Sequence, residues 1–328
     1  MPPLVSVVVP ALNAGPWIEA ALASVAAQIW PRDALEVLVV DDGSSDDTAQ
    51  AARRSLHRDG LQHDVHRRDV TGGPAAARND GWRRAAGEWV QMLDADDLLD
   101  PHKLARQLAD ADVPDDVAVL SSPWSSLVER DGAWQPDGVT VDPRMGDDPL
   151  MSLLRADNFM ATGSQLFRRS WLEAVAGYDE RQGLVEDVNL LLRLVMAGGR
   201  ISHVPSPCPL FWYRRRANSL SSSDVREFVE ARLRNARLAE SHWRQAGALT
   251  PARRVFLAEV YASAIRSWTV DDPAAFDRIA GHIEALAPAF VPSEPTGVRR
   301  LARLVGYRRA ERAAGRYRRV KALVKGVQ

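Results

Sequence analysis

The chain has 328 residues, of which 46% are hydrophobic and 26% charged. This is the composition of an ordinary globular protein and excludes a fibrous or disordered chain. One cysteine, Cys208, excludes an internal disulfide framework, and no apolar run reaches the roughly 18 residues of a membrane span. No charged-then-apolar leader precedes the first strand pattern, so we expect a cytoplasmic protein.

The first half of the chain alternates strand and helix patterns. Residues 4–9 and 35–40 are short, β-branched apolar runs, as expected for strands covered on both faces. A helix is expected after Pro16 and another from about Thr48; a weak polar strand near 62–66, a helix over 72–86 and a strand over 88–93 follow. This alternation predicts an α/β fold with a doubly wound, mostly parallel sheet whose loops gather at the strand C-termini.

The second half is less regular before it becomes helical. Asp100 is expected to cap a helix with Pro101 at its first position. Residues 117–167 show short apolar patches, with turn signals at Asp131-Gly132 and Asp137-Gly138. Residues 185–196 have helical spacing, and the pattern from about Asp224 is almost entirely helical. A Ser-rich stretch before Asp224 predicts a boundary between a domain of residues 1–223 and a helical region of residues 224–328.

Three carboxylates end the strand pattern at 88–93. Asp94, Asp96 and Asp97 lie within four positions and repel one another unless a cation neutralises them. Mg²⁺ and Mn²⁺ are bound by few protein oxygens and share the rest of their shell with water and phosphates. The cluster therefore suits a metal and diphosphate site; the alternative is an acidic turn before the next helix.

Two other acidic groups stand at element ends. Asp42 follows a strand in a run of acidic and serine residues, where it could bind a ligand or help to cap the next helix. Glu186 and Asp187 begin a helix, where the helix dipole by itself favours acids. Each group is a candidate for function, with a purely structural alternative.

Seven motifs occur in order along the chain: VSVVVPALN from residue 5, VVDDGSSD from 39, GPAAARNDG from 73, AGE from 86 leading to DADD at 94, GYDE from 177, ED at 186 with LRL at 192, and YR at 213. In this order they resemble the family 2 glycosyltransferases of the GT-A fold. Together they cover roughly residues 4–223. The resemblance implies a metal-dependent, inverting transfer of a sugar from a nucleoside diphosphate, with UDP expected first and dTDP second.

The resemblance also implies roles for the donor-site residues. Asp96 would be the direct ligand of Mn²⁺ or Mg²⁺, Asp94 would contact the ribose or a metal-bound water, and Asp97 would support the cluster. Asp42 would accept the imide N–H of a pyrimidine. The remaining contacts to the nucleotide would come from Pro10, Ala11, Asn13 and Arg78. For Arg78 a surface salt bridge is the structural alternative.

On the acceptor side, the resemblance makes Asp187 the general base and lets Glu186 orient the base or the acceptor. Arg214 and Arg216 match a segment that closes over the diphosphate. Many relatives carry a His near Arg216, and this chain has none there. That departure leaves protein metal ligands beyond Asp96 in doubt and suggests that Arg214 or Arg216 neutralises phosphate.

Two rival functions are less compatible with these motifs. A sugar nucleotidyltransferase needs a Gly-rich, basic phosphate loop after the first strand, whereas this loop reads PALNAG from Pro10. A non-catalytic sugar-nucleotide sensor or scaffold has no need of a base such as Asp187. The acceptor stays open: a glycan, a lipid-linked saccharide, a peptide or a small molecule, but no nucleic acid.

The C-terminal tail is strongly basic. From Val298 onward it carries 11 Lys and Arg against one Glu, so the rest of the chain has 31 basic and 42 acidic residues. Apolar residues recur among these charges at helical spacing: Leu301, Leu304, Val305, Val320, Leu323 and Val324. The tail is expected to pack on the acidic body of its own chain, to touch an anionic membrane peripherally, or to form a homodimer.

Overall fold

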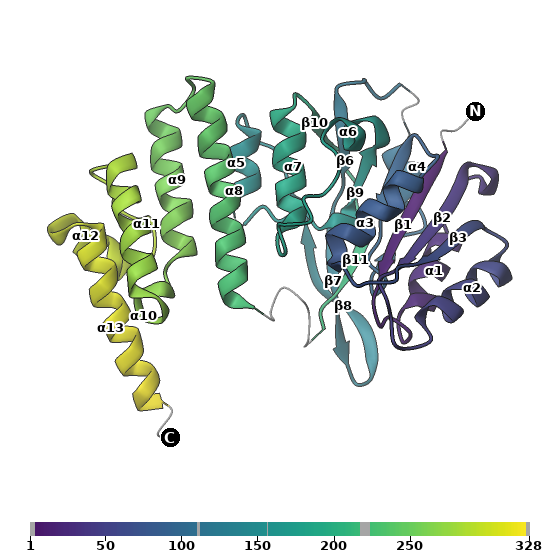
Figure 1. The fold of residues 1–328 in the computed structure, drawn as a ribbon, viewed down its shortest axis with the longest axis horizontal. Coiled ribbons are helices and arrows are strands. Elements are labelled where there is room, and N and C mark those ends of the chain that lie inside the picture. The colour runs from purple at the N-terminus through teal and green to yellow at the C-terminus, as the bar shows by residue number, and fades with distance from the viewer. Residues whose placement is uncertain (1–3, 110–111, 156, 217–223, 326–328) are drawn as a thin grey trace. The chain divides into compact units, whose positions relative to one another are not determined.

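The computed structural model describes residues 4–109, 112–155, 157–216 and 224–325 (Figure 1). The chain divides into two compact units, Met1–Asp224 and Val225–Gln328.

The first unit is an α/β structure. In chain order it contains β1 (Val5–Ala11), α1 (Ile18–Ala26), η1 (Arg32–Ala34), β2 (Leu35–Asp41), α2 (Thr48–Asp59), β3 (Gln62–Arg67), α3 (Gly73–Arg84), β4 (Trp89–Met92), β5 (Leu98–Leu99), α4 (Lys103–Gln107), β6 (Val117–Ser121), β7 (Trp124–Arg130), β8 (Ala133–Val141), α5 (Pro149–Leu154), η2 (Thr162–Ser164), β9 (Gln165–Arg168), α6 (Arg169–Ala174), α7 (Glu186–Met196), β10 (Arg200–His203) and β11 (Phe211–Arg214).

A seven-stranded sheet forms the centre of this unit, in the order β10-β6-β9-β4-β1-β2-β3. β1 pairs in parallel with β2 and β4, β2 with β3, and β10 with β6. β9 is antiparallel to both β4 and β6. The predicted α/β fold with a mostly parallel sheet is therefore confirmed, and one reversed strand comes from the region that was expected to be irregular.

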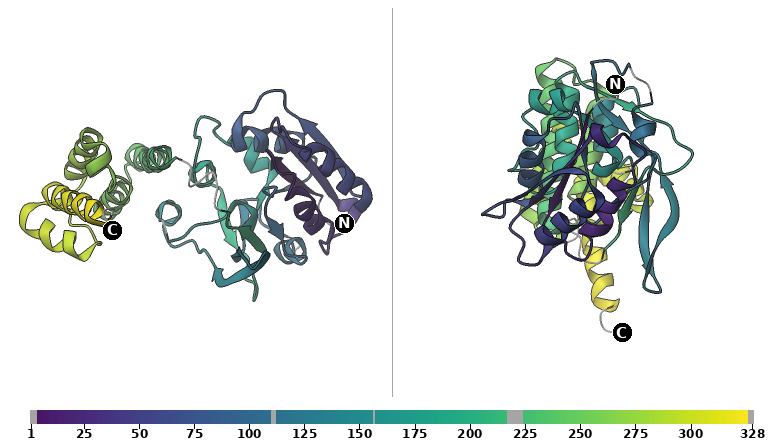
Figure 2. Two further views of the ribbon diagram at one scale, coloured as in Figure 1. Left: turned by 90° about the horizontal axis from the view of Figure 1, so that it is seen from below. Right: turned by 90° about the vertical axis from the view of Figure 1, so that its right-hand side faces the viewer.

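Helices cover both faces of the sheet because side chains alternate along each strand. Val7 and Val9 of β1 belong to a core cluster with residues of α1 and α2. Val8 faces the opposite side, where α3 approaches so closely that a Cβ on Gly81 would lie 2.2 Å from a Val8 methyl group. Figure 2 shows the layers from two further directions. Because β1 is parallel to β2 and to β4, the C-terminal ends of these three strands lie at the same edge of the sheet.

A smaller four-stranded sheet has the order β5-β11-β7-β8. Its β7–β8 hairpin turns at Asp131 and Gly132, both with positive φ, as the turn signal indicates. The second signal, at Gly138, has φ 85° but lies inside β8, opposite a shift in the pairing register of β7. It is therefore an irregularity within a strand and not a loop.

The expected helix start at Pro101 is wrong by two residues. α4 begins at Lys103, because Asp100 Oδ1 accepts the backbone N–H of His102 and forms a turn ahead of the helix.

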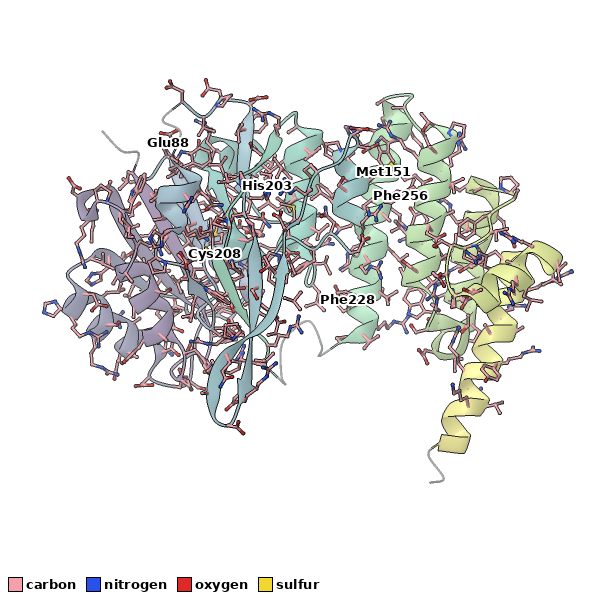
Figure 3. All side chains as sticks on the ribbon, turned by 180° about the vertical axis from the view of Figure 1, so that it is seen from behind. Glu88, Met151, His203, Cys208, Phe228 and Phe256 are labelled. Atoms are coloured by element: carbon pink, nitrogen blue, oxygen red, sulfur yellow. The ribbon has the colours of Figure 1, made fainter. Side chains whose placement is uncertain are left out.

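Further along the chain, Cys208 is an exposed free thiol between β10 and β11 (Figure 3).

The second unit is helical, as its sequence pattern indicates. It contains α8 (Val225–Gln245), α9 (Pro251–Ala264), α10 (Trp268–Asp271), α11 (Pro273–Leu286), α12 (Thr296–Val305) and α13 (Tyr307–Lys325). Buried Glu240 of α8 ties three helices together by accepting hydrogen bonds from Tyr261 and Arg244 and pairing with His282. Among the described residues, no helix combines the length and apolar character needed to cross a membrane.

Candidate active site

The candidate site lies where β1, β2 and β4 end, at the edge where open α/β sheets bind ligands. Asn13 follows β1 with φ 49°, and its side-chain oxygen accepts the backbone N–H and the hydroxyl of Ser45. The hydroxyl of Ser44 in turn accepts the backbone N–H of Asn13. Pro10 and Ala11 are buried at the end of β1, and the Ala11 carbonyl accepts the N–H of Asp42. The loops after the first two strands are thus joined into one wall.

Asp42 is 2% exposed and heavily hydrogen-bonded. Its carboxylate accepts the backbone N–H groups of Gly72 and Gly73 and a guanidinium N–H of Arg68 at 2.8 Å. Charge-assisted hydrogen bonds of this kind are the stronger ones in proteins. Asp42 therefore anchors the start of α3, and a contact from it to a nucleotide base stays a prediction.

Arg68, which the sequence did not single out, lies between Asp42 and Asp80, with 2.9 Å separating its Nε from an Asp80 oxygen. An open cavity of about 310 Å³ adjoins it and is lined by His66, Arg67, Arg68, Asp69, Val70 and Asp80. The cavity is polar and lies beside the carboxylate predicted to bind the base.

The acidic cluster forms a tight turn after β4. The N–H of Asp97 donates to the Asp94 carbonyl, and Asp97 is 2% exposed. Burial raises the pKa of Asp97 well above its ordinary value, and the neighbouring Asp96 and Asp94 raise it further. Burial and Asp94 also raise the pKa of Asp96, while Arg216 and Arg214 oppose that rise. A cation beside the turn would relieve this repulsion.

Two arginines approach the turn from the end of β11. Arg214 donates its backbone N–H to Asp97 and a guanidinium N–H to the Asp96 carbonyl. Arg216 Nη2 lies 2.5 Å from an Asp96 carboxylate oxygen. Both guanidinium groups are therefore held at the cluster, and their contact with phosphate stays a prediction.

An aromatic pair supports these arginines. The ring centroids of Trp17 and Trp134 are 5.7 Å apart in an edge-to-face arrangement. Arg214 lies over both rings, at 5.6 and 5.8 Å, and Arg216 lies 5.8 Å from Trp17. Sequence reasoning missed this arrangement, because Trp17 fits a helical pattern and Trp134 lies in a hairpin whose position over the site no local signal reveals.

Arg78 links the two acidic groups of the site. It is 5% exposed, its Nη2 lies 2.7 Å from Asp94, and its Nη1 lies 2.5 Å from Glu186. Its guanidinium also lies 5.5 Å from the Tyr178 ring centroid. The surface salt bridge considered for this residue is wrong, because the ion pairs are buried.

The acidic pair begins α7 directly after Val185, whose φ of 58° is unusual for a β-branched residue. Glu186 is buried against Arg78, whereas Asp187 is half-buried and accepts the Val188 N–H on Oδ1 at 2.7 Å. Burial raises the pKa of Asp187 to about 7, and the charge of Glu186 adds to the effect. A carboxyl group with a pKa near neutrality can exchange a proton at working pH, which suits a general base.

The carboxylates fit a divalent ion held by few protein oxygens. Asp94 and Asp96 each place one oxygen on an arginine, which leaves the other as a candidate ligand. Among the described residues, no group of three or more His, Cys, Asp or Glu side chains is arranged as a metal cage. Mg²⁺ and Mn²⁺ commonly bind through one or two carboxylates and complete their shells with water and phosphate.

The chain is similar to several known proteins. The family profile described as "Glycosyl transferase family 2" matches residues 6–176. The succinoglycan biosynthesis protein ExoU of Rhizobium meliloti is 30% identical over 244 residues, which cover 69% of this chain and 68% of ExoU.

The poly(ribitol-phosphate) beta-N-acetylglucosaminyltransferase TarS of Staphylococcus aureus is 26% identical over 250 residues, and this chain covers 42% of its length. A crystal structure of TarS residues 1–349 with UDP-GlcNAc has a TM-score of 0.67 at 20% identity, covering 96% of this chain and 92% of that one. The mannosyltransferase PcManGT of Pyrobaculum calidifontis, with GDP-Man and Mn²⁺, has a TM-score of 0.54 at 23% identity, covering 96% and 87%. At these identities the structural likeness establishes the fold.

Proposed function

The chain belongs to glycosyl transferase family 2, and we propose that it transfers a sugar with inversion from a nucleoside diphosphate donor to an acceptor hydroxyl or other nucleophile. The observation that carries the proposal is Arg78, whose guanidinium bridges Asp94 in the acidic turn and Glu186 in the acidic pair. Donor-side and acceptor-side carboxylates therefore belong to one site, as a single displacement step requires.

The nucleotide would bind at the wall formed by Pro10, Ala11 and Asn13, with its base toward Asp42. A uracil or thymine imide N–H could donate to the Asp42 carboxylate, which is already orientated by Arg68 and by the start of α3. The solved structures of TarS and PcManGT hold UDP-GlcNAc and GDP-Man. Both ligands are nucleoside diphosphate sugars, which supports this donor class, and we expect UDP first.

The diphosphate would lie against the acidic turn with its charge neutralised from two sides. Asp96 would bind Mn²⁺ or Mg²⁺ directly and Asp94 would contact the ribose or a metal-bound water; the ion would stabilise the charge on the departing diphosphate. Arg214 and Arg216 would bind phosphate oxygens, with Trp17 and Trp134 holding their guanidinium groups in place. Mn²⁺ in the PcManGT structure supports the metal.

Asp187 would act as the base. The acceptor oxygen attacks the anomeric carbon while the bond from that carbon to the diphosphate oxygen breaks, and the bonding pair leaves with the diphosphate. Since Asp187 Oδ1 accepts the Val188 N–H, the acceptor proton would pass to Oδ2. Attack opposite the leaving group inverts the anomeric centre.

A donor screen tests this function. The full chain is incubated with UDP-, dTDP- and GDP-sugars and Mn²⁺ or Mg²⁺, and nucleotide release is measured before any acceptor is known. The proposal expects slow hydrolysis of at least one donor that excess EDTA abolishes. Release of no nucleotide from any donor, or release unchanged by EDTA, would contradict it.

A further inference from the structure

The inner side of the C-terminal helix pair is packed within its own unit. Val298, Ala302 and Ala310 form a small core between α12 and α13. Arg308 and Arg312 of α13 pair with Asp277 of α11. One face of α12 and α13 therefore packs within the second unit, as expected for a tail that packs on its own chain.

The outer side of the same helices exposes large apolar residues. Leu304 is 83% exposed and Val305 40% exposed at the end of α12. Tyr317 and Val320 of α13 are 67% and 60% exposed, and their spacing of three residues places them on one helix face. Four large apolar side chains are thus exposed on these two helices.

Cations surround these apolar residues. Six basic side chains of α12 and α13 are exposed and take part in none of the ion pairs found among the described residues: Arg300, Arg303, Arg309, Arg316, Arg319 and Lys321. Glu311, the one acidic residue of these two helices in the sequence, is 1% exposed and pairs with Arg318. The outer face is therefore apolar and positively charged, without a compensating acid of its own.

We propose that this outer face, defined by Leu304, Val305, Tyr317 and Val320 with the six cations, docks on the surface of an anionic lipid bilayer. Its apolar side chains would enter the headgroup region while the arginines bind lipid phosphates, the two contributions that reversible attachment of an amphipathic helix requires. A second copy meeting this face through the same surface would bring two cationic faces together. The proposal is independent of the reaction assigned to the first unit.

Vesicle sedimentation of the full chain tests the charge contribution. Phosphatidylcholine vesicles with phosphatidylglycerol should bind the protein, pure phosphatidylcholine should not, and added salt should release it. Because each basic residue near an anionic surface contributes about a fivefold change in binding, Arg300→Glu with Arg303→Glu should weaken binding by about tenfold or more. The matched control is Arg106→Glu with Arg130→Glu, two exposed positions in the first unit, which should bind like wild type.

The apolar contribution has its own variant. Leu304→Ser with Val320→Ser should weaken vesicle binding at low salt while the melting temperature stays at the wild-type value, since both side chains are exposed. Wild type that ignores anionic vesicles, or Arg300→Glu with Arg303→Glu that sediments like wild type, would overturn the proposal. Self-association without lipid that Leu304→Ser with Val320→Ser abolishes would also overturn it and would point to a second copy of the chain. Retention of the protein on polyglutamate without vesicle binding would overturn it as well and would point to an acidic protein.

Discussion

Arg78 and Glu186 form a buried ion pair of 2.5 Å across 108 residues of sequence. Because the other end of the same guanidinium lies on Asp94, the pair connects the start of α7 to the turn after β4. The positions of Asp94 and Glu186, which we propose belong to the donor and acceptor sides, are therefore coupled through one side chain.

Replacing Arg78 by Gln should lower both stability and activity. Removing one partner of a buried ion pair leaves uncompensated charge and costs roughly 3–5 kcal/mol, so the melting temperature should fall. The charge of Arg78 also lowers the pKa of Asp187, so the acid limb of the pH-rate profile should move to higher pH. The control is Arg83→Gln, which replaces a half-exposed arginine on the same helix. It should change neither the melting temperature nor the acid limb of the pH-rate profile. An unmoved acid limb in Arg78→Gln would refute the coupling.

The pH dependence of transfer should report Asp187. A base must be deprotonated to act, and burial with Glu186 holds the pKa of Asp187 at about 7. The rate at saturating substrate should therefore rise through neutral pH and level off above it. A rate that is already maximal at pH 5 would exclude this residue as the base.

The same carboxyl should oppose stability at high pH. Its folded pKa lies above its unfolded value, so the unfolded chain is the more readily ionised state and stability is lost as pH rises toward 7. Asp187→Asn should thus melt a few degrees higher than wild type at pH 8 and at the same temperature near pH 4. Equal melting temperatures of Asp187→Asn and wild type at both pH values would mean that folding does not raise the pKa of Asp187.

Asp42 carries a structural role together with its proposed binding role. Asp42→Ala removes the acceptor for Arg68, Gly72 and Gly73, so both the melting temperature and UDP affinity should fall, the latter by roughly 1–3 kcal/mol. Asp80→Asn, which removes the other partner of Arg68, is the control and should keep most of the affinity. Calorimetry showing equal UDP binding in Asp42→Ala and wild type would place the base elsewhere.

Replacing Trp17 should weaken UDP binding, because its ring contacts Arg216 and Arg214. Trp17→Leu removes both cation-π interactions of this ring, and each is worth about 0.5–1 kcal/mol at an exposed site. Arg216 loses its aromatic contact while Arg214 keeps the one with Trp134, so UDP binding should weaken by about two- to fivefold. Trp17→Phe keeps an aromatic face and should bind nearly like wild type. If Trp17→Leu binds UDP with wild-type affinity, the aromatic pair does not position the arginines for phosphate.

Local sequence signals predicted the parts of the fold that are locally determined. β1 and β2 are mostly apolar runs, and the turns after β2 and β4 carry their acids in the sequence itself. β9 was not predicted as an antiparallel strand between β4 and β6, because its pairing depends on partners 44 or more residues away, the smallest separation being that of Ser121 and Gln165. For the same reason the sequence identified Arg78, Asp94 and Glu186 but not the ion pairs between them, and it did not reveal that Trp17 packs against Trp134.

Calorimetric titration of UDP into wild type, Asp96→Asn and Asp187→Asn, each with Mn²⁺, tests the central claim most directly. Asp96 is assigned to the metal and diphosphate, and Asp187 to the acceptor proton. Asp187→Asn should therefore bind UDP like wild type, while Asp96→Asn should lose at least about tenfold in affinity, roughly 1.4 kcal/mol. Wild-type affinity in Asp96→Asn, or collapsed binding in Asp187→Asn, would contradict the division of the site into a donor side and an acceptor side.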